Sequence, residues 1–151
     1  MTLDNLAHGC LFFSNAEFLV PFIIVGYLWL GRNIFFHATC LLLISILLNI
    51  ALKHSFQIPL APELGKEGYA FPSGHMQATA AFYGWLWFKS NRVVVRIVLS
   101  AVLVGIGFGL VQLGYHNYQD VAGALFFAAL LGVVYYQVIT RWQHKKNGQL
   151  V

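Results

Sequence analysis

Charged residues are scarce in this sequence. They make up only 9% of its 151 residues, whereas hydrophobic residues make up 59%. A soluble globular domain has about a quarter of its residues charged. The shortage of charge therefore excludes a soluble globular protein and indicates an integral membrane protein. A chain of this length has room for one domain, which we expect to cover residues 1–151.

Cysteine is also scarce, and the features of a signal peptide are missing. The two cysteines, Cys10 and Cys40, do not have the spacing of metal ligands, and Cys40 lies within an apolar run. Neither a zinc site nor a disulfide is therefore indicated. The first 16 residues contain no basic n-region and no small-residue cleavage site. We therefore expect no removable signal peptide.

Long apolar runs are what the sequence does contain. They predict an all-α, polytopic membrane helix bundle with about five transmembrane helices plus a short N-terminal segment. The expected spans are residues 18–30, starting somewhat earlier with Glu17 near the helix end, and residues 34–52, 74–88, 93–113 and 121–140. A tight turn is expected at 31–33, and a polar loop at 53–69, where prolines and glycines cannot continue a helix. Three glycines, Gly105, Gly107 and Gly109, are expected to allow close helix packing.

The basic residues gather on one side of these spans. The side of the C-terminus has Arg32, Lys89, Arg92, Arg96, Arg141, Lys145 and Lys146, whereas the other side has only Lys53 and Lys66, together with all five acidic residues. By the positive-inside rule, the side of the C-terminus is cytoplasmic. We therefore expect a protein of a bacterial-type inner membrane, with the loop at 53–69 and the segment at 115–120 on its outer face.

Residues 71–77, Phe-Pro-Ser-Gly-His-Met-Gln, lie where the polar loop gives way to an apolar run. Pro72 at the first position of a helix would lose nothing, because its missing N–H would be unpaired there anyway. The amides that follow lie at the positive end of the helix dipole and form a site suited to an anion. His75 adds a group that can donate a proton near neutral pH. An ordinary helix start with a capping histidine is the alternative interpretation of this stretch.

His116 and Asp120 open the last span and are four residues apart, so we expect both side chains on one helical face. A carboxylate bonded to one imidazole nitrogen fixes the tautomer and leaves the other nitrogen free to attack or to take a proton. An aspartate at the edge of a membrane helix is costly without a partner, which makes it a functional candidate. The alternative is a helix-capping aspartate beside an interfacial histidine.

The order of these features carries more information than any one of them. Lys53 ends one span, residues 72–75 (Pro-Ser-Gly-His) start the next, and residues 116–123 (His-Asn-Tyr-Gln-Asp-Val-Ala-Gly) start a later one. This order resembles the type 2 phosphatidic-acid phosphatase superfamily, the membrane lipid phosphatases related to vanadium haloperoxidases, over residues 53–123. The resemblance implies a phospholipid or polyprenyl phosphate as substrate. It implies no cofactor, no metal ion and no nucleic-acid partner.

The resemblance also implies a role for each polar group. His116 would attack the phosphorus and form a phosphohistidine, and Asp120 would orient and charge it. His75 would protonate the leaving oxygen and later activate water. The implied phosphate-binding groups are Lys53, Ser73, Gly74 and the helix-start amides. Phosphoryl transfer is mostly positioning and stabilisation of charge, so these donors could suffice without a metal ion.

The chain departs from the family pattern at both motif arginines. Leu60 stands where the first motif has an arginine, and Gly109 and Leu110 stand where the third motif begins Ser-Arg. Arginine binds phosphate with two parallel hydrogen bonds, whereas lysine offers only a point charge. The candidates to compensate are Lys66, His54, Gln57 and Gln112. Each of them could equally be a solvated loop residue or a helix-packing amide.

The sequence thus predicts a metal-independent lipid phosphatase that removes a phosphate, or one phosphate of a diphosphate, at the outer face of the membrane. Two alternatives remain open at this point. The same histidine could pass the phosphoryl group to a lipid hydroxyl, which would make the protein a phosphotransferase. The chain could instead be a non-catalytic lipid-binding or scaffold member of the family that lost turnover with its arginines. The sequence does not indicate an oligomeric state.

Overall fold

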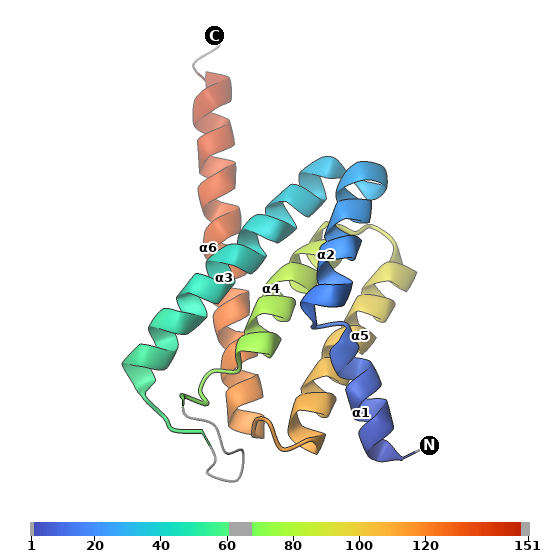
Figure 1. The fold of residues 1–151 in the computed structure, drawn as a ribbon. Coiled ribbons are helices and arrows are strands. Elements are labelled where there is room, and N and C mark those ends of the chain that lie inside the picture. Colours follow the sequence, from blue (N-terminus) through green and yellow to red (C-terminus); the bar gives the residue numbers. More distant parts are fainter. Residues whose placement is uncertain (1, 61–67, 149–151) are drawn as a thin grey trace.

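The computed structural model describes residues 2–60 and 68–148, with side chains as far as residue 145. These residues form a bundle of helices (Figure 1). The helices are α1 (Leu3–Phe12), α2 (Ala16–Val25), the π-helical turn η1 (Gly26–Leu30), α3 (Arg32–Phe56), α4 (Gly74–Lys89), α5 (Val93–Gln112) and α6 (Tyr118–Gly148). Within the described ranges the β-structure is limited to one isolated bridge between Pro59 and Tyr69. The prediction of an all-α fold is confirmed.

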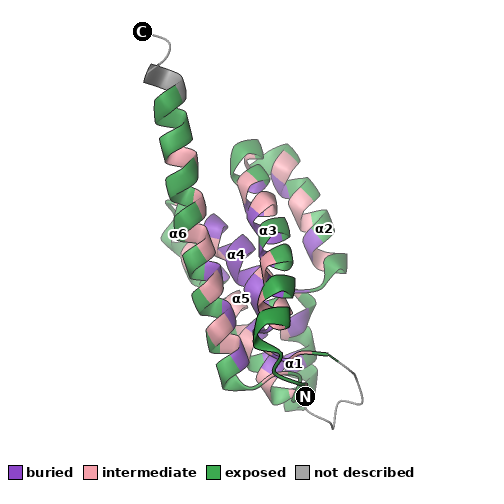
Figure 2. Ribbon diagram, turned by 90° about the vertical axis from the view of Figure 1, so that its left-hand side faces the viewer, coloured by how far each residue is buried: buried purple, intermediate pink, exposed green. Residues whose placement is uncertain are grey.

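Helix α4 forms the centre of the bundle. It packs against α3, α5 and α6, and its buried residues include Met76, Phe82 and Tyr83. Figure 2 shows this buried ribbon enclosed by helices that are more exposed. The interior also contains polar contacts between helices, because Asn49 Nδ2 of α3 donates to Gln77 Oε1 of α4 at 2.9 Å. Buried polar groups need such partners, so this bond helps to fix α4 relative to α3.

Three helices, α3, α5 and α6, are each long and apolar enough to cross a membrane. A fourth span results if α1 and the segment Ala16–Leu30, which meet at an angle of 42°, cross together as one bent pair. Helix α4 has 16 residues, fewer than the roughly 20 that a span ordinarily needs. The chain is therefore an integral membrane protein, but the predicted number of five spans is not confirmed.

Two predicted boundaries are wrong. The expected turn at 31–33 consists of Gly31 alone, because Arg32 already begins α3. The loop was expected to begin at residue 53, but α3 continues to Phe56 and carries Lys53 in its last turn. The first proline after Lys53 is Pro59, so nothing breaks the helix before that region. Gln57, with φ of 52°, ends the helix in the left-handed conformation.

The N-terminal segment is a helix that packs along α5, and glycines of α5 make room for it. A Cβ atom at Gly109 would lie 2.8 Å from the carbonyl oxygen of Ala7. A Cβ atom at Gly105 would lie 3.1 Å from Cys10 Sγ. The expectation of close packing is confirmed at these two positions. The partner helix, α1, did not follow from the sequence.

Candidate active site

The first part of the site is the start of α4, which is capped by Ser73. The Met76 N–H donates to Ser73 Oγ at 3.5 Å, and Ser73 is fully buried. Pro72 therefore lies before the cap and outside the first helical position, which corrects the expectation from the sequence. His75 lies in the first turn of α4. First-turn N–H groups have no partner within their own helix, so those of Gly74 and His75 remain available to an anion.

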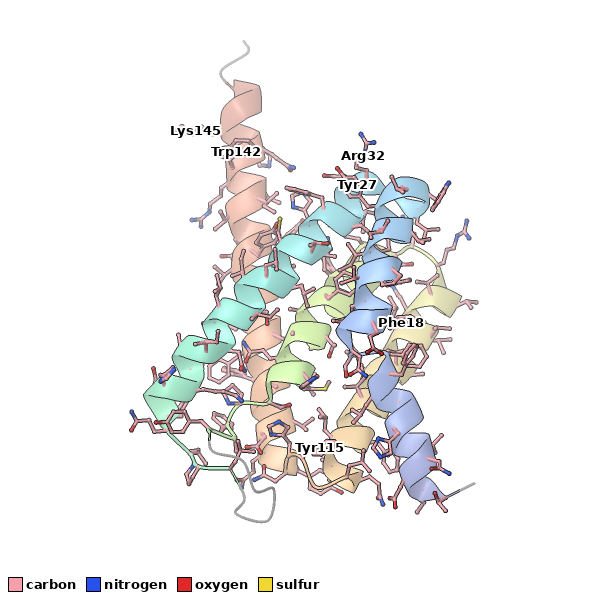
Figure 3. The ribbon with its side chains drawn as sticks, viewed as in Figure 1. Phe18, Tyr27, Arg32, Tyr115, Trp142 and Lys145 are labelled. Carbon is pink, nitrogen blue, oxygen red and sulfur yellow. The ribbon has the colours of Figure 1, made fainter. Side chains whose placement is uncertain are left out.

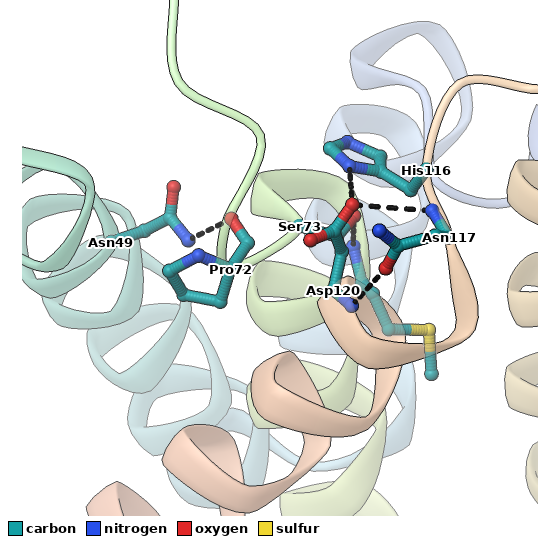
Figure 4. A network of polar contacts seen from close by, with 7 residues as sticks. Asn49, Pro72, Ser73, His116, Asn117 and Asp120 are labelled. Carbon is teal, nitrogen blue, oxygen red and sulfur yellow. Dashed lines mark hydrogen bonds and ion pairs between the residues drawn. The ribbon is translucent and has the colours of Figure 1, made fainter. Parts of the chain in front are cut away.

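The second part of the site is the start of α6, where Asp120 contacts both Asn117 and His116. The Asp120 N–H donates to Asn117 Oδ1 at 2.8 Å, and the Asn117 N–H donates back to Asp120 Oδ2 at 3.1 Å. This reciprocal pair is a capping box. The same Oδ2 lies 3.2 Å from His116 Nδ1 (Figure 4). Asp120 is therefore both a helix-capping residue and the partner of His116.

His116 itself lies in the turn before α6 and not on the helix, so the expectation of a shared helical face is wrong. The capping box brings the two side chains together instead, because it turns the Asp120 carboxylate back over the preceding residues. Asp120 is only 3% exposed, and its carboxylate can accept but not donate. The contact fits the His116 tautomer that is protonated on Nδ1, which leaves the lone pair of Nε2 exposed for reaction.

Burial lowers the pKa of His116, and the hydrogen bond from its ring to Asp120 opposes this shift. The positive charge of Lys53 adds a smaller contribution in the lowering direction. A lowered pKa keeps the imidazole neutral at neutral pH, which is the form that can act as a nucleophile.

The two helix starts are joined directly. The Ser73 N–H donates to the backbone carbonyl of Asp120 at 3.2 Å, and Asn49 Nδ2 donates to the carbonyl of Pro72 at 3.1 Å (Figure 4). Gly123 is the last residue of the stretch 116–123 that carries His116 and Asp120, and a Cβ atom there would overlap the ring of Phe71. The absence of a side chain at 123 thus lets the segment before α4 lie against α6.

Replacing Gly123 with alanine is expected to displace Phe71 and to destabilise the protein by about 1–3 kcal/mol, the usual cost of overpacking. The midpoint of thermal unfolding, Tm, of the purified protein in detergent measures this effect. Gly132→Ala is the matched control on α6, because no described atom lies within 4 Å of a Cβ added there. Equal Tm values for the two variants would contradict this account of Gly123.

His75 and His116 lie between two cavities, which meet at these histidines. The first, here called the α1-side cavity, has a volume of about 420 Å³ and is lined by His8, Leu11 and Asn15 as well as by both histidines. The second, here called the α2–α3 groove, has a volume of about 520 Å³. Its polar end holds Lys53, Gly74 and both histidines, and its walls are formed by Leu19, Val20 and Ile23 of α2 and Leu42, Ile46 and Ile50 of α3.

The structure thus brings together the six residues predicted for catalysis and phosphate binding. Lys53, Gly74, His75 and His116 line the α2–α3 groove, and Asp120 contacts His116. Ser73 differs from the expectation, because its hydroxyl is used as the cap of α4 and its side chain is buried. Figure 3 shows Tyr115, next to His116, at one end of the molecule, and Arg32 and Lys145 at the other.

Three of the four candidates expected to compensate for the missing arginines do not reach the site. The rings of His54 and Tyr69 pack edge to face, with centroids 5.7 Å apart, and Gln57 is exposed. Gln112 Nε2 lies 3.5 Å from Asp4 Oδ1 of α1. None of these three side chains lines either cavity. Lys66 lies outside the described residues.

Sequence reasoning missed His8 and Asn15, which line the α1-side cavity from the N-terminal part of the chain. Both precede the region that carries the motifs, and neither has a spacing that relates it to His75 or His116. The signal that could have pointed to them is the glycine pattern of α5, but it does not say which helix fills the space beside it.

The arrangement of helices defines a class of membrane protein fold. It superposes with a TM-score of 0.71 on the transmembrane PAP2-type phosphatidylglycerolphosphate phosphatase of Bacillus subtilis, at 23% sequence identity, covering 92% of this chain and 77% of that one. It superposes with a TM-score of 0.77 on LpxE of Aquifex aeolicus, at 18% identity, covering 89% of this chain and 86% of that one. At these identities the likeness concerns the fold alone.

The chain belongs to the PAP2 superfamily, whose sequence model matches residues 21–144. It is also 26% identical over 149 residues to phosphatidylglycerophosphatase B of Bacillus subtilis strain 168, a match that covers 85% of this chain and 71% of the relative. The resemblance drawn from the order of the motifs is thereby confirmed.

Proposed function

We propose that this protein is a lipid phosphatase that removes a phosphate, or the terminal phosphate of a diphosphate, from a membrane lipid. The observation that carries the proposal is the position of His116, which contacts Asp120 and shares two cavities with His75. The Bacillus relative is a phosphatidylglycerophosphatase, which supports a lipid phosphate as the substrate of this chain. The whole chain acts as one domain in this proposal.

The proposed reaction has two steps. In the first, His116 Nε2 attacks the phosphorus, the bond between phosphorus and the leaving oxygen breaks, and His75 gives its proton to that oxygen. In the second, His75 takes a proton from water, the water oxygen attacks the phosphorus of the phosphohistidine, the bond between phosphorus and His116 Nε2 breaks, and inorganic phosphate leaves. The free N–H groups at the start of α4 and the charge of Lys53 stabilise the phosphoryl oxygens in both steps.

The α2–α3 groove supports a substrate with an apolar tail. Helices α2 and α3 join at η1 and diverge toward the site (Figure 1). Apolar side chains line the groove between them, and Lys53, His75 and His116 lie at its polar end. A lipid can therefore place its phosphate between the histidines and its tail along the groove, where apolar burial contributes about 0.8 kcal/mol for each methylene group.

Narrowing this groove tests the placement of the tail. Ile46→Trp is expected to raise KM for a long-chain lipid phosphate by about tenfold, the loss expected for two buried methylene groups. The same change should leave KM for a short, water-soluble phosphate ester nearly unaltered. Leu47→Trp is the control, because Leu47 neighbours Ile46, is 68% exposed and does not line the groove. If Ile46→Trp changed KM by the same factor, relative to the wild type, for the lipid and for the soluble ester, the proposed placement would be contradicted.

The topology is part of the proposal. Five spans, with α4 and the segment Ala16–Leu30 crossing as well, place the two ends of the chain on opposite sides. The excess of basic residues then puts the C-terminus in the cytoplasm and the site at the outer face of a bacterial inner membrane. The separation of Tyr115 from Arg32 and Lys145 in Figure 3 supports this arrangement.

The direct test is release of phosphate from a panel of lipid monophosphates and diphosphates by the purified protein in detergent, with EDTA present. Release by the wild-type protein supports a metal-independent phosphatase and ranks its substrates. Adding a lipid alcohol tests for transfer, because a phosphotransferase would form a new lipid phosphate in place of free phosphate. A folded protein that forms neither product would contradict the enzymatic proposal.

A further inference from the structure

The α1-side cavity contains the two positions at which the family pattern has an arginine. Leu60 and Leu110 both line it, together with His75 and His116. Side chains at these positions therefore do face the reacting histidines, but in this chain they are apolar. A phosphoryl group between His75 and His116 would meet no guanidinium on this side.

His8 faces the same cavity from α1. His75 and His116 are assigned to proton transfer and nucleophilic attack. Among the described residues lining the cavity, His8 is the remaining side chain that can carry a positive charge. Asn15 adds an amide there, because its side chain makes no capping bond at the start of α2.

The sequence changes that remove one arginine also allow the helix that carries His8 to pack in its present position. At position 109 the family pattern has a serine, and a serine Cβ would lie 2.8 Å from the carbonyl oxygen of Ala7 and 3.0 Å from Leu11 Cγ. A Cβ atom almost never approaches backbone atoms so closely, so the present position of α1 depends on the absence of a side chain at Gly109. Leu110 is 2% exposed and packs in the core beside this contact.

We propose that His8 binds the phosphoryl oxygens of the substrate, in place of the arginines that Leu60 and Leu110 do not supply. This inference rests on the proposed function in that the ligand is a phosphoryl group. An imidazolium N–H gives one charge-assisted hydrogen bond where a guanidinium gives two, so His8 is a weaker clamp. On this proposal, the change at 109–110 removes an arginine and also lets α1 pack where it brings His8 to the cavity in place of that arginine.

Inorganic phosphate is the probe that separates binding from turnover. A ligand that binds only the folded protein raises its Tm. Phosphate is expected to raise the Tm of the wild type and of His144→Ala, but not that of His8→Ala. His144 is an exposed residue near the far end of α6, so it receives the same substitution away from the site. His8→Arg keeps a cation at this position and is expected to keep the rise in Tm.

Turnover gives a second measure. His8→Ala is expected to lower kcat/KM for a lipid phosphate by about tenfold to a hundredfold, the effect of losing one hydrogen bond to a charged group. His144→Ala should leave kcat/KM unchanged.

An equal rise in Tm in the wild type, His144→Ala and His8→Ala, or no rise in the wild type, would overturn the role of His8. If the wild type hydrolyses no lipid phosphate while its rise in Tm depends on His8, the proposed function fails and the phosphate-binding role of His8 stands.

Discussion

His116→Ala is expected to reduce phosphate release from a lipid phosphate by a factor on the order of 10⁴ or more, as removal of a nucleophile does in other enzymes with covalent intermediates. The loss should appear in kcat and should not come from unfolding. Asp120 keeps the hydrogen bond from the Asn117 N–H in this variant, so the start of α6 remains capped. A Tm close to that of the wild type checks this point.

The covalent intermediate gives an independent readout. Wild-type protein mixed with a lipid carrying labelled phosphate should hold label on the protein during turnover, and acid should release it because a phosphorus–nitrogen bond is acid-labile. His116→Ala should hold none, whereas His144→Ala should behave as the wild type does. Full phosphate release by His116→Ala would disprove the proposed nucleophile.

The sequence was sufficient to predict those parts of the fold that depend on local pattern. Apolar runs located α3, α5 and α6, and the polar start of residues 72–75 located α4, because a span and a helix cap are both read from neighbouring residues. The order of the motifs also predicted that His75, His116 and Asp120 would meet, and the structure places them together. Their chemical roles remain predictions.

The parts that could not be predicted depend on contacts between distant segments. The helical shape of residues 53–56 follows from the absence of an early breaker, but nothing in those residues shows where the helix stops. The docking of α1 depends on the space beside Gly109, and the sequence shows the glycine without naming Ala7 as its neighbour. His8 therefore reached the list of site residues only through the fold.

Asp120 illustrates a different limit. The spacing of His116 and Asp120 suggested a helical i, i+4 pair, whereas the contact is made across a capping box with Asn117. Both geometries bring a carboxylate to an imidazole, so the correct partner followed from the wrong local structure. A pattern of residue types can thus identify a pair of groups while leaving the backbone between them undetermined.

His75→Ala is expected to slow the first step according to the leaving group. A lipid monophosphate expels an alkoxide, which needs a proton in the transition state, so this substrate should lose about 10²–10⁴ in rate, the usual contribution of a general acid. A lipid diphosphate expels a phosphate monoester, whose second pKa is about 6 and which can leave without that proton. The loss for the diphosphate should therefore be much smaller in this step.

The second step separates the acid role of His75 from its role as base. An activated aryl phosphate also has a good leaving group, so His75→Ala should still be phosphorylated by it, releasing one equivalent of phenol in a burst. The phosphohistidine should then hydrolyse slowly, because His75 no longer takes a proton from the attacking water. Stopped-flow measurement of the phenol shows the burst and the slow phase. An equal loss of rate for monophosphate, diphosphate and aryl ester, without a burst, would mean that His75 positions the substrate and does not transfer protons.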